Sequence, residues 1–335
     1  MSKKIILLFD GTWNNTQDKT NVVRLRDSIV SSGRADADQP CFYDTGVGTH
    51  WYDRLTGGAF GRGLSRNIRQ GYQWLCGKYQ PGDQVFVSGF SRGAYTARSL
   101  VGMIRKCGVL RTAGAARVDE AYELYRDKNT APDDDNAKAF RAAHSNEIRI
   151  RFLGVWDTVG ALGIPISHVP FSRDYYTWHD TELSKIVDHA YHAIATDERR
   201  KDYAVAVWTK IKPENIEVEQ RWFVGAHANV GGGYTKSPAD TLPNPPLRWM
   251  QDKAEAAGLK FRNKAPVAEK DCFAEVNNSF KEFMYGIYKI FKNPFDRPFG
   301  NGVREIVDAS VWSRWREKPD YRPASLNSHP ERPNY

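Results

Sequence analysis

A serine, a histidine and an aspartate, each following a predicted strand, are the residues of this sequence that could do chemistry together. Ser91 lies in the run from Gly89 to Gly93 (GFSRG), between the apolar stretch 85–87 and a helical pattern at 94–104. A sharp turn from strand to helix needs residues without a Cβ where neighbouring backbone comes close, which explains the two glycines. The serine hydroxyl is then held at a helix N-terminus, whose free N–H groups can bind a developing oxyanion. The pattern predicts a nucleophile elbow.

The second signal is a histidine that follows a predicted strand and precedes three consecutive glycines. His227 comes after the stretch 218–224 and just before the run Gly231 to Gly233, which gives its loop unusual backbone freedom. A neutral imidazole can take the proton of a serine as it attacks and return it to the leaving group. We therefore expect His227 to be the general base.

The third residue is a carboxylate that fixes the tautomer of the imidazole. Asp157 directly follows the predicted strand 148–156, so the chain order is Ser, Asp, His, as in α/β-hydrolases. Asp197 and Asp240 are the alternative acids. The structural alternative is that Asp157 caps a loop.

The loop after the first predicted strand, Lys4 to Phe9, should face the same crevice, because ligands of open parallel sheets bind outside the carboxyl ends of the strands. Backbone N–H groups of Gly11 and Thr12 are expected to complete an oxyanion hole with that of Arg92. Alternatively the loop is a structural turn in which an aspartate caps backbone amides. The residues expected to support the site or touch substrate are Asp10, Phe90 and Asn229.

The order of elements predicts the fold class. Strand, helix and strand in succession indicate parallel pairing, and hence a doubly wound, mostly parallel α/β-hydrolase-like sheet with helices on both faces and irregular loop and helical insertions. The glycine-rich segment 46–63 is expected to be a flexible loop beside the crevice. Strands are predicted at 4–9, 41–43, 85–87, 148–156, 204–210 and 218–224, and helices at 22–30, 64–79, 94–104, 115–127, 183–195 and 247–257.

Residues 1–240 are expected to form the catalytic core. Residues 241–318 are expected to form a helical part that packs on the core or caps it, and 319–335 an extended proline-rich tail. The aromatic segment 160–178 either walls an acyl pocket, acts as a lid, or packs on the core. The apolar stripe from Phe280 to Phe291 should be buried against the sheet or a cap, with a lipid surface as the alternative.

Composition limits the class of protein and its partners. With 48 Lys and Arg against 40 Asp and Glu in 335 residues, the net charge of +8 favours an anionic partner such as a phospholipid surface. Nucleic-acid binding is not expected, because the sequence has no groove-reading motif. Four distant cysteines indicate neither a zinc site nor a disulfide framework, and a reducing compartment follows. His189 and His192 are expected to pack rather than bind metal, and no cofactor is needed.

The N-terminal apolar run ends at Asp10, which is too short for a signal peptide, and no stretch approaches the length of a membrane span. We expect synthesis in the cytoplasm and export, if any, by a route that needs no cleaved signal.

Four motifs taken together resemble a known family. They are Phe9 to Asn14 (FDGTWN), Gly89 to Ala94 (GFSRGA), Val155 to Gly160 (VWDTVG), and His227 with the run Val230 to Tyr234 (VGGGY). This combination is similar to the DUF2235 family of α/β-hydrolase-like proteins, which includes the Tle1-type phospholipase effectors of the bacterial type VI secretion system.

The resemblance implies a serine hydrolase whose triad is Ser91, Asp157 and His227. It also implies lipid esters such as glycerophospholipids as substrates, contact with a membrane surface, and a delivery or immunity protein as a partner. Family members often carry Asp where this chain has Asn229. The alternatives are an esterase, thioesterase or peptidase acting on a soluble acyl substrate, and a catalytically inactive binding or scaffold protein.

Overall fold

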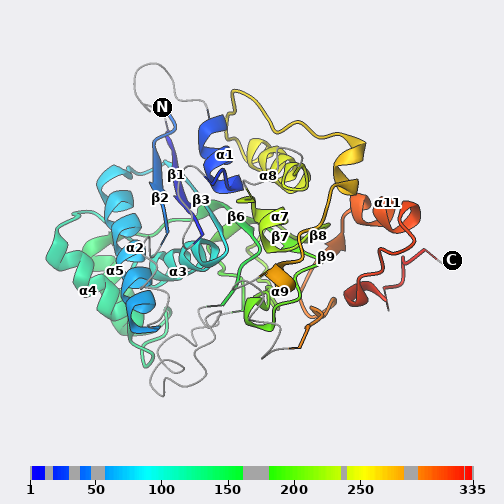
Figure 1. The fold of residues 1–335 in the computed structure, drawn as a ribbon. Helices are drawn as coiled ribbons and strands as arrows, with labels where there is room; N and C mark the ends of the chain where they lie inside the picture. The colour runs from blue at the N-terminus through cyan, green and yellow to red at the C-terminus, as the bar shows by residue number, and fades with distance from the viewer. Residues whose placement is uncertain are drawn as a thin grey trace.

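The computed structural model describes residues 2–11, 18–29, 38–46, 57–160, 181–234, 240–282, 293–327 and 329–333. Within these ranges a seven-stranded sheet runs in the order β2-β1-β3-β6-β7-β8-β9 (Figure 1), and every pairing in it is parallel. The predicted α/β-hydrolase-like, doubly wound fold is therefore confirmed. The strands are β1 Lys4–Phe9, β2 Cys41–Asp44, β3 Gln84–Phe90, β6 Ile150–Trp156, β7 Val187–Ala195, β8 Glu217–Phe223 and β9 Glu305–Val307.

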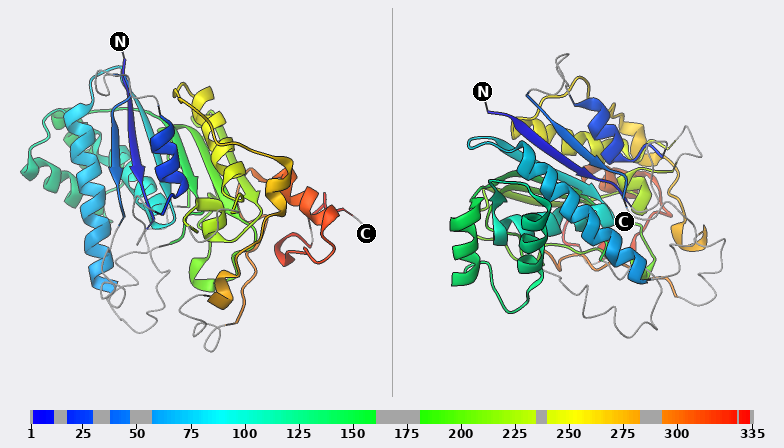
Figure 2. Two further views of the ribbon diagram at one scale, coloured as in Figure 1. Left: turned by 45° about the horizontal axis from the view of Figure 1, so that its top comes forward. Right: turned by 90° about the vertical axis from the view of Figure 1, so that its left-hand side faces the viewer.

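Helices cover both faces of the sheet, as Figure 2 shows. Successive residues of a strand point to opposite faces, so Leu7 packs in one apolar cluster with residues of α2, α3 and α4, and Leu8 packs in another with residues of α1 and α8. Burial on both faces explains why the central strands are almost continuously apolar. The helices of the first layer are α2 Gly57–Lys78, α3 Arg92–Cys107 and α4 Ala115–Arg126; those of the second are α1 Asn21–Ser28, α7 His227–Gly231 and α8 Asn244–Ala256.

The prediction of a helix at 183–195 is wrong, because most of this segment forms the strand β7. Alanine-rich sequence favours a helix locally, but pairing with β6 on one side and β8 on the other overrides that preference. His189 and His192 are three apart on this strand, so their side chains point to opposite faces of the sheet.

Two further predictions of local structure are corrected. The glycine-rich segment 46–63 is not a loop throughout, because α2 already begins at Gly57. The segment 204–210 is not a strand of the sheet: it forms isolated bridges at Val205 and Lys210 and separate backbone hydrogen bonds, such as that from Val303 N–H to Trp208 O at 2.8 Å. The sequence patterns also missed α5 (Asp135–His144) and an antiparallel pair, β4 (Val109–Leu110) with β5 (Ser145–Asn146).

The C-terminal part contributes to the main sheet through β9, which pairs with β8. After β9, α11 (Ala309–Glu317) packs in a third apolar cluster. Leu326 is fully buried in the same cluster, so at least this part of residues 319–335 packs on the molecule. The division of the chain at residues 240 and 318 stays a prediction.

No helix in the described ranges is both long and apolar enough to cross a bilayer. The aromatic segment 161–178 and the apolar stripe after α9 (Ser279–Glu282) lie outside the described residues.

Candidate active site

The carboxyl ends of β3, β6 and β8 bring together the three side chains singled out in the sequence. Ser91 follows β3, Asp157 follows β6, and His227 follows β8 after a short turn. Cross-strand hydrogen bonds continue past the strand ends and fix these positions: Ser91 N–H donates to Trp156 O at 3.0 Å, and Asp157 N–H donates to Ala193 O at 2.7 Å. The register of the sheet therefore sets the position of the site.

The backbone at Ser91 has the strained conformation expected of the sharp strand-to-helix turn predicted at this residue. Its φ is 59° and its ψ −123°, a region that residues with a Cβ rarely adopt. The turn is tight because α3 lies directly over β1. A Cβ on Gly93 would lie 2.2 Å from Phe9 O, and one on Gly89 would lie 2.5 Å from Gly93 O. Only glycine fits at these two positions, which is the physical basis of the motif.

A continuous chain of hydrogen bonds joins the three side chains. Ser91 Oγ lies 2.7 Å from His227 Nε2, and His227 Nδ1 lies 2.5 Å from Asp157 Oδ2. All three residues are buried, with exposures of 5%, 6% and 0% respectively. Asp157, like Ser91, has a positive φ, here 40°, which turns its carboxylate toward the ring.

The direction of each hydrogen bond follows from the charges. Burial would raise the pKa of Asp157, but the Arg297 guanidinium and the hydrogen bond from His227 outweigh it and hold that pKa well below its usual range. The ionised carboxylate only accepts, so Nδ1 carries the proton and Nε2 accepts from the Ser91 hydroxyl. Burial also lowers the pKa of His227, despite its bond to Asp157, so the neutral imidazole predominates at pH 7.

Two aromatic rings hold the imidazole. The Phe90 ring lies 4.6 Å from the His227 ring between centroids, and the Tyr203 ring meets it edge-on at 5.1 Å. Phe90, predicted as an accessory residue, therefore contacts the histidine itself.

The alternative acids are bonded elsewhere. Asp197 accepts from Gly225 N–H at 2.7 Å and from the Tyr321 hydroxyl at 3.0 Å. Asp240 accepts from Leu242 N–H and from the Asn229 side chain. In the described part of the chain, the carboxylate bonded to the His227 ring is that of Asp157.

Asn229 supports the turn that carries His227. Its Oδ1 accepts from Ala226 N–H at 3.1 Å, and its Nδ2 donates to Asn277 Oδ1 at 2.8 Å. It is fully buried two residues beyond His227, on the helix α7. Its role is to connect this turn to residues of the C-terminal part.

The first loop is a bonded structural turn. The Asp10 carboxylate accepts from Gly11 N–H at 2.7 Å, from Thr20 Oγ1 at 2.7 Å and from the Tyr43 hydroxyl at 2.8 Å. The Gly11 N–H predicted for the oxyanion hole is therefore engaged in this structure. Thr12 lies outside the described residues, and its role stays a prediction.

Two buried ionic groups beside the site were not indicated by any sequence motif. Glu198 accepts from His227 N–H at 3.2 Å and pairs with the Arg200 guanidinium at 2.8 Å. Arg297 donates to both carboxylate oxygens of Asp157. Arg200 is only two residues from Glu198 in the sequence, whereas Arg297 is 140 residues from Asp157.

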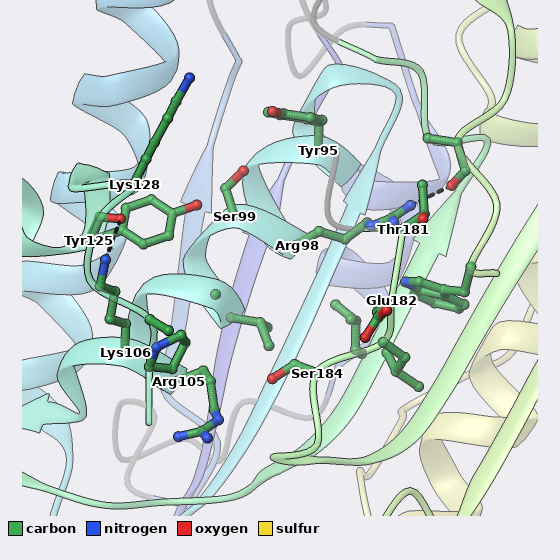
Figure 3. Close-up of a pocket in the computed structure, with 18 of the residues that line it drawn as sticks. Tyr95, Arg98, Ser99, Arg105, Lys106, Tyr125, Lys128, Thr181, Glu182 and Ser184 are labelled. Carbon is green, nitrogen blue, oxygen red and sulfur yellow. Dashed lines mark hydrogen bonds between the residues drawn. The ribbon is translucent and has the colours of Figure 1, made fainter. Parts of the chain in front are cut away.

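A cavity of about 470 Å³ lies along the flank of α3, separate from Ser91, Asp157 and His227 (Figure 3). Tyr95, Arg98, Ser99 and Arg105 project toward it from successive turns of the helix, and Glu182 faces them from the other side. Among the described residues, no three His, Cys, Asp or Glu side chains are placed to hold a metal ion.

The family model of the catalytic domain of Tle1-like phospholipase effectors of the type VI secretion system matches residues 3–253. The chain belongs to this family. It is also 31% identical, over 311 residues, to an uncharacterized protein of Saccharomyces cerevisiae; the match covers 76% of this chain and 43% of that protein. The chain therefore spans less than half the length of this relative.

Similar solved structures include an uncharacterized protein from Pseudomonas aeruginosa, with 17% identity and a TM-score of 0.45; the match covers 78% of this chain and 46% of that one. Another is the butyrate-bound esterase Est2 of Thermogutta terrifontis, with 14% identity and a TM-score of 0.40; the match covers 77% of this chain and 84% of that one.

Proposed function

We propose that this protein hydrolyses acyl esters of lipids, with glycerophospholipids as the substrate class, by a serine mechanism. The observation that carries the mechanism is the pair of hydrogen bonds that joins Ser91 to His227 at 2.7 Å and His227 to Asp157 at 2.5 Å. Membership of the family of phospholipase effector catalytic domains supports the lipid substrate.

In the first half of the reaction, Ser91 Oγ attacks the ester carbonyl while His227 Nε2 takes its proton. Asp157 stabilises the imidazolium that forms. The Arg92 N–H, at the start of α3, is assigned to the oxyanion, and loss of one such donor typically costs about 10²–10³ in turnover. Return of the proton to the alkoxide releases the alcohol and leaves an acyl-enzyme. Water, activated by His227, then hydrolyses the acyl-enzyme to the free fatty acid and restores Ser91.

The test compares the wild-type protein, Ser91→Ala, and Ser88→Ala as a matched control that alters another buried serine, on β3. We expect a fluorophosphonate to label the wild type and Ser88→Ala but not Ser91→Ala. Both labelled proteins should release fatty acid from vesicles of phosphatidylethanolamine and phosphatidylglycerol.

The other outcomes identify the alternatives. Turnover of p-nitrophenyl butyrate without release from vesicles would indicate a soluble acyl substrate. Labelling that survives in Ser91→Ala would overturn the assignment of the nucleophile. A folded wild-type protein with neither labelling nor turnover would indicate a non-catalytic binding protein. Membrane contact and a delivery or immunity partner stay predictions from the family.

A further inference from the structure

Arg297 reaches the centre of the site from a distant part of the chain. It lies in the segment before β9, beyond residue 253, where the match to the catalytic-domain family ends. Its side chain is fully buried, and it donates to Asp157 Oδ1 at 2.6 Å and to Asp157 Oδ2 at 2.9 Å. This is the bidentate geometry in which a guanidinium binds a carboxylate most specifically.

The other hydrogen bonds of the two residues fix the orientation of the carboxylate. Arg297 also donates to the backbone oxygens of Ala195 at 2.9 Å and Tyr203 at 2.6 Å, so its own position is set by β7 and the turn after it. Asp157 Oδ1 accepts in addition from Ala195 N–H at 2.9 Å. Oδ2 is thereby left facing His227, and rotation of the carboxylate would break several bonds at once.

The ion pair of Asp157 with Arg297 also sets the net charge next to the imidazole of His227. Among the described residues, charged side chains that act on His227 include those of Asp157, Glu198 and Arg200; Arg297 binds Asp157, and the Tyr203 ring packs against the imidazole. These form two buried pairs, Asp157 with Arg297 and Glu198 with Arg200. His227 therefore faces a neutralised carboxylate rather than a bare anion, and its imidazolium is stabilised less than it would be by the aspartate alone.

We propose that Arg297 is a positioning residue of this site, which aims Oδ2 of Asp157 at His227 and limits the negative charge that the carboxylate presents to the ring. The effect of Arg297 on catalysis rests on the proposed function, but its effect on Asp157 and on the protonation of His227 does not. Because the arginine lies beyond the matched domain, the C-terminal part of the chain completes the site.

The experiment follows the titration of the His227 ring by NMR in the Ser91→Ala background, so that no turnover is needed. Arg297→Gln removes the cation and should raise the pKa of His227 by about one unit or more. Arg297→Lys keeps the charge and should leave the titration nearly unchanged. The control is Arg199→Gln, which removes an exposed ion pair to the neighbouring Asp296 and should change nothing. An unchanged titration in folded Arg297→Gln overturns the proposal.

A second comparison applies if Arg297→Gln does not fold. Asp157→Asn and Asp157→Asn/Arg297→Gln differ only in the cation, so the ring should titrate about one unit higher in the double variant. Equal titration in the two would overturn the proposal. With Ser91 restored, the acid limb of the plot of kcat/KM against pH should shift to higher pH in Arg297→Gln. Arg297→Lys should lower kcat at least about tenfold without shifting this limb. Absence of turnover in the wild type would contradict the proposed function but not the titrations.

Discussion

Glu198 accepts the backbone N–H of His227 at 3.2 Å, so one buried carboxylate holds the backbone of this residue while Asp157 holds its ring. The same carboxylate binds Arg200 through two hydrogen bonds of 2.8 Å and Ser279 Oγ at 2.9 Å. Burial would raise the pKa of Glu198, but the bond and charge of Arg200 lower it to about 2. This residue thus connects the start of α9 with the histidine.

Glu198→Gln should therefore destabilise the protein strongly. It removes the charge of Glu198 from the buried guanidinium of Arg200, and breaking a buried pair in this way typically costs about 3–5 kcal/mol. The control is Glu182→Gln, which removes a more exposed carboxylate paired with Lys210 and Lys212 and should cost at most about 1 kcal/mol. Urea unfolding monitored by circular dichroism measures the free energy of unfolding of both variants. Equal costs for the two variants would argue against a structural role for the buried pair.

Replacing each candidate acid separately tests the assignment of Asp157. Asp157→Asn should lower kcat/KM on a phospholipid by about 10³–10⁴, because it disturbs the tautomer and charge of the His227 ring. Asp197→Asn and Asp240→Asn change carboxylates whose bonds go to other groups, and each should stay within about tenfold of the wild type. A large loss in either of these variants, with a small one at Asp157, would reverse the assignment.

A substitution at Gly93 tests the close packing of α3 on β1. Gly93→Ala places a methyl group 2.2 Å from Phe9 O, so the helix must shift and carry Ser91 with it. We expect destabilisation of about 3 kcal/mol or more and slower fluorophosphonate labelling. Gly77→Ala, in α2, meets no atom within 4 Å and should be neutral or stabilising by up to about 1 kcal/mol. Thermal unfolding of both variants checks the contrast.

The buried ring of His192 should make the stability of the protein depend on pH. Burial lowers its pKa to about 3, and the folded protein keeps the ring neutral because Nε2 accepts from Thr158 N–H at 3.0 Å. The unfolded chain takes up the proton at about pH 6.5. The stabilisation from the neutral ring is therefore complete above pH 6.5 and is lost as the pH falls toward 3. His192→Gln should make the fall in Tm between pH 7 and 5 shallower, and an unchanged slope would contradict this.

Much of the site could be predicted from sequence because its chemistry is local to strand ends. The sharp turn at Ser91 and the two glycines beside it form a short motif that can be recognised from consecutive residues, although Gly93 is also required by its close approach to Phe9 O. The chain order of serine, aspartate and histidine indicated which distant residues could meet, and the structure brings Ser91, Asp157 and His227 within hydrogen-bonding distance.

The residues that were missed depend on tertiary contacts. Arg297 bonds a residue 140 positions away, so no spacing or neighbour could have pointed to it. Most of the segment predicted as a helix at 183–195 is the strand β7, and its pairing with the two neighbouring strands is a tertiary contact that local sequence does not show. The bond from Gly11 N–H to Asp10, by contrast, joins adjacent residues and matches the alternative in which Asp10 caps backbone amides of the first loop.

The origin of Arg297 in the C-terminal part has a consequence for biosynthesis. A nascent chain that has left the ribosome only as far as His227 contains the three reactive side chains without the cation that neutralises Asp157. Burying that carboxylate alone costs several kcal/mol, so the reactive geometry should form only once residue 297 has been translated. Translation of the segment around residue 297 would then have to precede assembly of the hydrogen-bonded site.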